Sequence, residues 1–327
     1  MRYRRAEAKE AARAQFRGVW AAITTPFTPD GAVDEAGLRR NMRYYTDGLH
    51  VEGVFCTGVM GEFWSLTRDE RRRVVEIVVE EARSKCLVIA QTGHHSARET
   101  IEHTRHAQEV GADYAVCINP YYPPANETML YNWFAEVIAA CDIGLWLFDT
   151  QYCGVQLSPE LIARLADFEP VCGIKVAWPL EHYAAVHRLC ADRLVVSHPS
   201  ERLWLSLMRD YGQRVHNSSP TPYLFQTPDW LPMREYTELG LAGRFDEAAR
   251  VAATLEPLRE VHERWEISPW RDRRILPIAY VKAWSELLGL AGGPVRPPLP
   301  QVTDEERAAM RADLERVGLL AHVAAPA

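Results

Sequence analysis

The sequence predicts a single (β/α)8 TIM barrel followed by a C-terminal helical extension. Two observations predict this fold: eight short apolar runs rich in Val, Ile and aromatic residues recur along the chain, and helix-like segments separate them. Runs that are apolar on both faces suit buried parallel strands, and connections of this length suit β-α-β units, which together favour a closed barrel. The 327 residues are a normal length for a barrel with an appendage.

The predicted strands occupy the first two thirds of the chain. They cover residues 17–26, 51–58, 87–93, 114–120, 143–149, 171–177, 193–199 and 214–219. Helix starts are marked between them, because Thr67 with Glu70 and Ser96 with Glu99 have the spacing of capping boxes. Ser158 followed by Pro159 predicts a further N-cap. Strand and helix therefore alternate, as a barrel requires.

The two ends of the chain are predicted to lie beyond the barrel, which spans residues 17–228. Residues 1–16 are expected to form an N-terminal extension, a short basic helix outside the main fold. This segment lacks the apolar stretch of a signal peptide, and nowhere do about 18 apolar residues follow one another. Residues 229–327 are expected to be a helical region packed on the barrel, with Thr303 capping the last helix.

The charge and residue composition of the chain indicate which classes of molecule it binds. The formal net charge of -7 argues against nucleic acid and against an anionic membrane, because both favour a positive surface. A small-molecule substrate fits better. The seven cysteines contain no C-x-x-C pair, so we expect reduced thiols in a cytoplasmic protein. No metal or other cofactor is expected: His103 and His106 share a helical face, but no carboxylate or cysteine stands at ligand spacing.

One lysine stands out. The chain has only four lysines among its 37 basic residues, and Lys175 lies within the apolar run Val171-Cys172-Gly173-Ile174-Lys175-Val176-Ala177. Burial lowers the pKa of a lysine, and a neutral amine is what attack on a carbonyl requires. Barrel active sites lie at the C-terminal ends of the strands, and Lys175 is near the end of the predicted sixth strand. Lys175 is therefore the candidate nucleophile, although a lysine that pairs with a buried carboxylate would have the same pattern.

Four motifs in order along the chain carry a resemblance. They are Gly58-Val59-Met60-Gly61-Glu62, Pro120-Tyr121-Tyr122, Gly173-Ile174-Lys175 and Gly293-Pro294-Val295-Arg296-Pro297-Pro298. From about Gly18 to Leu320 the chain resembles the dihydrodipicolinate synthase / N-acetylneuraminate lyase family. The resemblance implies a (β/α)8 barrel, a homo-oligomer (tetramer or dimer) and class I aldolase chemistry on pyruvate or another 2-oxo acid, with Lys175 forming the imine.

The same resemblance implies substrate-binding positions. The family's loop after the second strand binds the carboxylate of the oxo acid, which points to Gly58, Val59, Met60, Gly61 and Glu62. Here Val59 and Met60 replace the hydroxyl residues of the family, but the backbone N–H donors do not depend on those side chains. Phe148, Trp178 and His198 are expected to contribute to the substrate pocket.

The family's proton relay is altered. A Tyr-Asn pair near the end of the fifth strand corresponds here to Phe148 and Asp149, and phenylalanine transfers no proton. Acid-base help contributes roughly 10²- to 10⁴-fold, so another group is required. We expect Asp149 and His94 to replace the tyrosine, and Tyr122 matches a family tyrosine that completes the relay from a neighbouring subunit. The synthases' substrate-binding arginine has no counterpart in residues 150–154, which argues against dihydrodipicolinate synthase activity itself.

Three functions follow as hypotheses. The leading one is a Schiff-base-forming carbon-carbon lyase, an aldolase or hydratase-aldolase. The second is a dehydratase, because Glu62-Phe63-Trp64-Ser65-Leu66-Thr67 resembles a run found in the sugar-acid dehydratases of this family. The third is a barrel that has lost catalysis and serves as a binding protein. Retention of Lys175 in an apolar strand favours the first two.

Overall fold

The computed structural model describes residues 3–123 and 125–323, and the backbone alone of Ser218. All eight predicted strands are present. They are β1 (Gly18–Ala22), β2 (Gly53–Cys56), β3 (Leu87–Gln91), β4 (Tyr114–Ile118), β5 (Gly144–Thr150), β6 (Val171–Ala177), β7 (Val195–Ser197) and β8 (Val215–Ser219). They belong to one eight-stranded sheet with the order β7-β6-β5-β4-β3-β2-β1-β8. This order of parallel strands defines a (β/α)8 TIM barrel, so the predicted fold class is confirmed.

Helices separate the strands and follow the last of them. Those of the first 211 residues are α1 (Ala8–Gln15), α2 (Glu35–Arg43), α3 (Arg68–Ala82), α4 (Ala97–Val110), α5 (Glu127–Ala139), α6 (Pro159–Leu165), α7 (Leu180–Cys190) and α8 (Glu201–Tyr211). The later ones are α9 (Thr221–Leu224), α10 (Pro232–Leu241), α11 (Phe245–Ala253), α12 (Glu256–His262), α13 (Ser268–Arg273), α14 (Ile278–Leu287) and α15 (Asp304–Arg316). The predicted helical C-terminal region is thus confirmed as helical.

Short helical turns complete the chain. Three are 3₁₀ turns, η1 (Arg5–Glu7), η3 (Gln151–Cys153) and η5 (Leu319–His322), and two are π-helical, η2 (Tyr44–Gly48) and η4 (Glu263–Ile267). Thr67 and Glu70 form the predicted capping box, and the Ser158 side chain caps α6 as predicted. The Ser96 side chain caps α4, but the backbone N–H of Ser96 donates to His94 Nδ1, so this cap lacks the reciprocal bond of the predicted capping box. Local sequence therefore sets where these helices begin.

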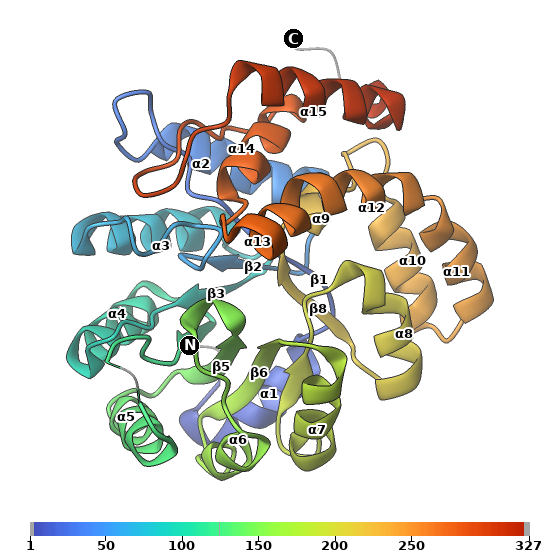
Figure 1. Ribbon diagram of the computed structural model, residues 1–327. Coiled ribbons are helices and arrows are strands. Elements are labelled where there is room, and N and C mark those ends of the chain that lie inside the picture. The colour runs from blue at the N-terminus through green and yellow to red at the C-terminus, as the bar shows by residue number, and fades with distance from the viewer. Residues whose placement is uncertain (1–2, 124, 324–327) are drawn as a thin grey trace. The chain divides into compact units, whose positions relative to one another are not determined.

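Contacts divide the chain into two compact units. The first combines residues 1–17 with Leu87–Ser218, and the second combines Gly18–Cys86 with residues 219–327. In the first unit β3, β4, β5, β6 and β7 pair in parallel, each with the next. Helices α4, α5, α6 and α7 lie along the outer side of these strands (Figure 1). The candidate nucleophile Lys175 belongs to this unit.

The N-terminal helix differs from the prediction. It forms as expected, but within the first unit it is packed against the strands instead of lying outside the fold. Ala8 and Ala12 are fully buried, and the Phe16 ring lies 4.3 Å from the Trp146 ring of β5. The Tyr114 hydroxyl of β4 donates to the side chain of Gln15 at 2.6 Å. The alanine spacing buries one face of the helix, which its high charge had obscured.

The second unit joins the first two strands to the C-terminal helices. Strands β1 and β2 pair in parallel, and the Tyr223 hydroxyl of α9 donates to the backbone oxygen of Ala22 at 2.8 Å. Helix α14 is buried on all sides from Ile278 to Ser285, including Trp284, whereas α15 buries a single face that includes Met310. The Tyr223 hydrogen bond places α9 against β1, and α14 in turn contacts α9 and α15.

Two further features of the described chain concern membrane-spanning helices and the state of the cysteines. In the described residues, no helix is both long and apolar enough to cross a membrane. All seven cysteines are buried, and none of them forms a disulfide within the described chain. Burial raises the pKa of several of these thiols, for example that of Cys56 to about 12, so they are protonated at neutral pH.

Candidate active site

Lys175 lies in the interior of β6, near its C-terminal end. Only 7% of the residue is exposed, and its Nζ lies 4.6 Å from the centre of the Phe148 ring. The parallel register aligns Lys175 with Phe148 of β5 on one side and with Ser197 of β7 on the other. An amine beside an aromatic ring in a buried strand is held in the kind of low-dielectric setting that imine chemistry uses.

A glycine two residues before Lys175 makes room for a tryptophan. A Cβ atom added to Gly173 would lie 2.2 Å from the Trp146 side chain, the residue aligned with it on β5. Trp146 and Phe148 alternate with Leu147 along β5 and therefore share a face with Gly173 and Lys175. The Gly-Ile-Lys motif thus has a packing reason as well as a chemical one.

Asp149 is completely buried and its carboxylate has three hydrogen-bonding neighbours. Oδ1 accepts from Trp178 Nε1 at 2.7 Å and from the Leu157 backbone N–H at 3.1 Å, while Oδ2 lies 2.8 Å from His182 Nε2 of α7. Because successive side chains of a strand point to opposite faces, Asp149 faces away from the side shared by Phe148 and Lys175. The carboxylate fixes the indole of Trp178, which immediately follows β6.

His198 and His216 are neutral neighbours of Lys175. His198 Nε2 donates to the Trp178 backbone oxygen at 2.9 Å, and its Nδ1 accepts from the Ser200 N–H at 3.2 Å. Burial, with a smaller effect of the Lys175 charge, lowers the pKa of His198. Burial, followed by the charges of Lys175 and His198, lowers the pKa of His216 to about 3. Neither imidazole is charged at neutral pH, and His198 has both nitrogens occupied.

The other two predicted catalytic residues have contrasting surroundings. His94 is half-buried after β3, and its Nδ1 accepts from the Ser96 N–H at 3.1 Å, so the neutral ring carries its proton on Nε2. Its ring lies 3.9 Å from that of His95. Tyr122 is 70% exposed. Within the described chain Tyr122 is therefore a surface residue.

One buried side chain near Lys175 was underrated from the sequence. Asn217 of β8 is 1% exposed, and within the described chain neither Oδ1 nor Nδ2 of its amide has a hydrogen-bond partner. Its backbone N–H donates to Ser197 Oγ at 3.3 Å, and Ser197 is the register partner of Lys175. A buried amide without a partner costs free energy unless a ligand or water binds it, which marks Asn217 as a possible substrate contact.

In the second unit, the predicted carboxylate-binding loop is a tight turn. Thr57 and Glu62, at its two ends, have positive φ angles of 50° and 53°. Such angles cost energy for residues other than glycine, and for a β-branched threonine they are exceptional. Among the described residues, no hydrogen bond is donated by the backbone N–H groups of Val59 and Met60, whose side chains are almost fully buried. Two adjacent N–H groups without partners form a suitable anion site.

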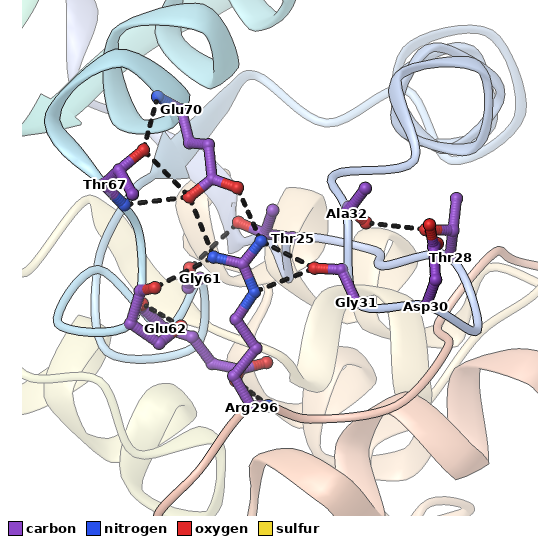
Figure 2. A network of polar contacts seen from close by, with 11 residues as sticks. Thr25, Thr28, Asp30, Gly31, Ala32, Gly61, Glu62, Thr67, Glu70 and Arg296 are labelled. Atoms are coloured by element: carbon purple, nitrogen blue, oxygen red, sulfur yellow. Dashed lines mark hydrogen bonds and ion pairs between the residues drawn. The ribbon is translucent and has the colours of Figure 1, made fainter.

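Glu62 is fully buried in an ion pair within the second unit. Its Oε1 lies 2.6 Å from Lys282 Nζ of α14, and its Oε2 accepts from the Arg296 backbone N–H at 3.0 Å. The Arg296 guanidinium in turn makes a two-point contact with Glu70 at 2.6 and 2.8 Å (Figure 2). The sequence predicted Glu62 as a substrate-binding residue; the structure places its carboxylate in this internal network.

Among the residues that the structure describes, no three His, Cys, Asp or Glu side chains gather in a way that would hold a metal ion. The first unit contains a buried amine, a buried amide and neutral imidazoles, and the second unit contains a turn with N–H donors.

The fold and these groups define a class: (β/α)8 barrels with a buried lysine near the end of the sixth strand. Residues 15–317 match the model of the dihydrodipicolinate synthetase family, and the chain belongs to this family of lyases. It is 33% identical to 4-hydroxy-tetrahydrodipicolinate synthase of Methanothrix thermoacetophila over 90% of this chain and 95% of that one. It is 30% identical to the enzyme of the same name from Methanopyrus kandleri, with 94% and 98% covered.

Solved structures of dihydrodipicolinate synthases have the same fold as this chain. Dihydrodipicolinate synthase from Aquifex aeolicus superposes with a TM-score of 0.81 at 26% identity, covering 93% of this chain and 99% of that one. A monomeric dihydrodipicolinate synthase variant gives a TM-score of 0.81 at 25% identity, with 94% and 99% covered. The fold and the family are therefore those expected from the sequence.

Proposed function

We propose that the protein is a Schiff-base-forming carbon-carbon lyase that acts on pyruvate or another 2-oxo acid. The observation that carries the proposal is Lys175: a buried lysine, at the family's imine position, in a chain that uses only four lysines. In its unprotonated form the amine attacks C2 of a 4-hydroxy-2-oxo acid, and the resulting carbinolamine loses water to give a protonated imine. The imine accepts the electron pair of the C3–C4 bond as a base takes the proton of the C4 hydroxyl, so that C4 leaves as a carbonyl compound; protonation of the enamine at C3 and hydrolysis then release the shorter oxo acid and the free lysine. The turn at Val59 and Met60 supplies N–H donors for a carboxylate.

The proton relay of this reaction is proposed to differ from that of the synthases. Phe148 occupies the tyrosine position and packs on Lys175 Nζ, so this side chain contributes only an apolar contact. Asp149 already holds Trp178 and His182, which favours a positioning role. His94, whose imidazole follows β3, is our preferred proton-transfer group.

We propose that Tyr122 acts in a homo-oligomer, where it would complete the relay of a neighbouring subunit. Size-exclusion chromatography with light scattering tests the predicted tetramer or dimer.

Reductive trapping with borohydride tests whether Lys175 is the nucleophile. We expect borohydride to reduce an imine formed with pyruvate or a related oxo acid, leaving a stable adduct on the peptide that contains Lys175. The Lys175→Arg variant should give no adduct, because a guanidinium does not form this imine. If the wild-type protein gives no adduct at Lys175 with any of a panel of oxo acids, the proposal is wrong and the binding-protein hypothesis gains.

Product analysis separates the competing reactions. A lyase yields two smaller carbonyl compounds, whereas a dehydratase, favoured by the Glu62-to-Thr67 run, releases water and keeps the carbon chain intact. We expect the first pattern. The curated relatives are named as synthases, so their condensation should be assayed in parallel. Efficient condensation with the synthases' own second substrate would overturn the view that Phe148 and residues 150–154 exclude that activity.

A further inference from the structure

The second unit contains another buried lysine that the proposed chemistry does not use. Lys282 of α14 is 1% exposed, pairs with the fully buried Glu62 at 2.6 Å, and donates to the Pro294 backbone oxygen at 2.9 Å. Burial lowers the pKa of Lys282, and the Glu62 charge opposes that shift. A buried ion pair pays a desolvation penalty that often equals its Coulomb gain, so stability alone is a weak explanation for it.

The pair lies at one end of the turn formed by residues 58–62. Both oxygens of Glu62 are held by the C-terminal region, Oε1 by Lys282 and Oε2 by the Arg296 N–H. Glu62 is also one of the two residues with positive φ that bound the turn, the other being Thr57. Backbone in this conformation persists only when its surroundings enforce it. At Glu62 the contacts from Lys282 and Arg296 act together with the backbone hydrogen bonds that Glu62 makes with Val59 and Ser65.

Arg296 secures the neighbouring segments. Its guanidinium donates to the Gly31 oxygen at 2.6 and 3.0 Å and to the Glu70 carboxylate (Figure 2). It also donates to the Ser65 oxygen at 2.9 Å. The guanidinium of Arg296 and the Nζ of Lys282 lie 4.3 and 4.1 Å from the Phe27 ring centre. Two cations and two carboxylates leave the network without net charge. Attraction of an anion to the turn therefore comes from the N–H dipoles and their fixed direction.

We propose that Lys282 is a positioning residue of the active site: by pairing with Glu62 it holds the turn in which the N–H groups of Val59 and Met60 bind the substrate carboxylate. The inference rests on the proposed function, because it assigns the turn to the oxo acid. Lys282 acts through Glu62, and the C-terminal helical region thereby becomes part of the substrate-binding apparatus.

The test is the pyruvate dependence of imine trapping in Lys282→Met. We expect the pyruvate concentration for half-maximal trapping to rise about tenfold or more, because the loss of one well-placed hydrogen bond to a charged group weakens binding by about that factor. The maximal trapping rate should change by less than about twofold, since the amine itself is untouched. Lys85→Met is the matched control: Lys85 pairs with Asp47 at 2.8 Å on the surface of the same unit, and its removal should shift neither quantity.

The outcomes separate the two proposals. No adduct in the wild-type protein defeats the proposed function, and with it this inference. An adduct whose half-saturation is the same in Lys282→Met and Lys85→Met overturns only the inference. If Lys282→Met does not fold, the double variant Glu62→Gln/Lys282→Met replaces it, because removal of both charges leaves no unpaired buried ion. A folded double variant with wild-type half-saturation also overturns the inference, and a raised value with a preserved maximal rate supports it.

Discussion

The buried carboxylate of Asp149 binds three hydrogen-bond donors and thereby holds neighbouring side chains in place. With Trp178, Leu157 and His182 around it, the carboxylate is fully used within the first unit. We expect Asp149→Ala to lower the free energy of unfolding by about 3 kcal/mol, because one buried N–H group and two partly buried side chains lose their partner. Asp149→Asn, which retains an acceptor oxygen, should cost about 1 kcal/mol. Urea denaturation of the three proteins measures both changes.

Activity distinguishes this positioning role from proton transfer. Asp149→Asn should keep most of its turnover and its adduct at Lys175, since an amide still holds the Trp178 indole. A folded Asp149→Asn protein whose turnover drops by roughly 10²-fold or more would instead identify Asp149 as the acid-base group predicted from the sequence.

At the same scale, the scarcity of lysine in this chain is informative for two residues. The argument that singled out Lys175 applies equally to Lys282, which lies in the apolar run Ile278-Ala279-Tyr280-Val281-Lys282-Ala283-Trp284. Both lysines are buried, at 7% and 1% exposure. The sequence does not reveal which carboxylate pairs with Lys282, because Glu62 is far from it along the chain. For Asn217 the sequence showed only a polar residue at the end of a predicted strand, since burial without a hydrogen-bond partner is a property of the folded state.

Strand β6 shows how one element combines packing and chemistry. Gly173 makes room for Trp146, and Lys175 on the same face meets Phe148. We expect Gly173→Ala to lower the free energy of unfolding by about 3 kcal/mol, because overpacking forces the indole and backbone to shift. Urea midpoints of the variant and the wild type check this.

A double-mutant cycle tests whether contact with Trp146 causes the loss of stability in Gly173→Ala. In a Trp146→Phe background the smaller ring leaves room for a methyl group, so Gly173→Ala should cost at least about 1 kcal/mol less there. Equal costs in both backgrounds would show that the glycine is needed for backbone reasons unrelated to Trp146.

At the scale of the whole molecule, buried neutral histidine makes stability depend on pH. The pKa of His216 falls from its ordinary value of 6.5 to about 3 in the folded protein. Between these values the unfolded chain binds a proton that the native state does not, so stability decreases as pH falls from 6.5 toward 3, by at most about 1.4 kcal/mol per pH unit. We expect the urea midpoint to drop between pH 7 and pH 5.

The His216→Gln variant shows how much of this pH dependence comes from His216, because glutamine does not titrate. Its midpoint should depend less steeply on pH in this window, with the lowered pKa values of His198 and His187 accounting for the remaining slope. A profile as steep as that of the wild type would mean that His216 does not carry the effect. Below about pH 4.5 a second loss is expected, because Arg296 holds the pKa of Glu70 at about 2 and protonation of that carboxylate weakens the pair.

The sequence by itself determined the eight strands, the main helix starts, the helical C-terminal region and the position of the candidate nucleophile. These features depend on local patterns: apolar runs, caps such as Thr67 with Glu70, and a lysine in an apolar strand. Tertiary structure decided the rest. It placed the N-terminal helix against β4 and β5, gave Asp149 its three donors, and paired Glu62 with Lys282. Contacts between residues distant in sequence, and positive φ angles at Thr57 and Glu62 that only such contacts sustain, leave no local pattern to read.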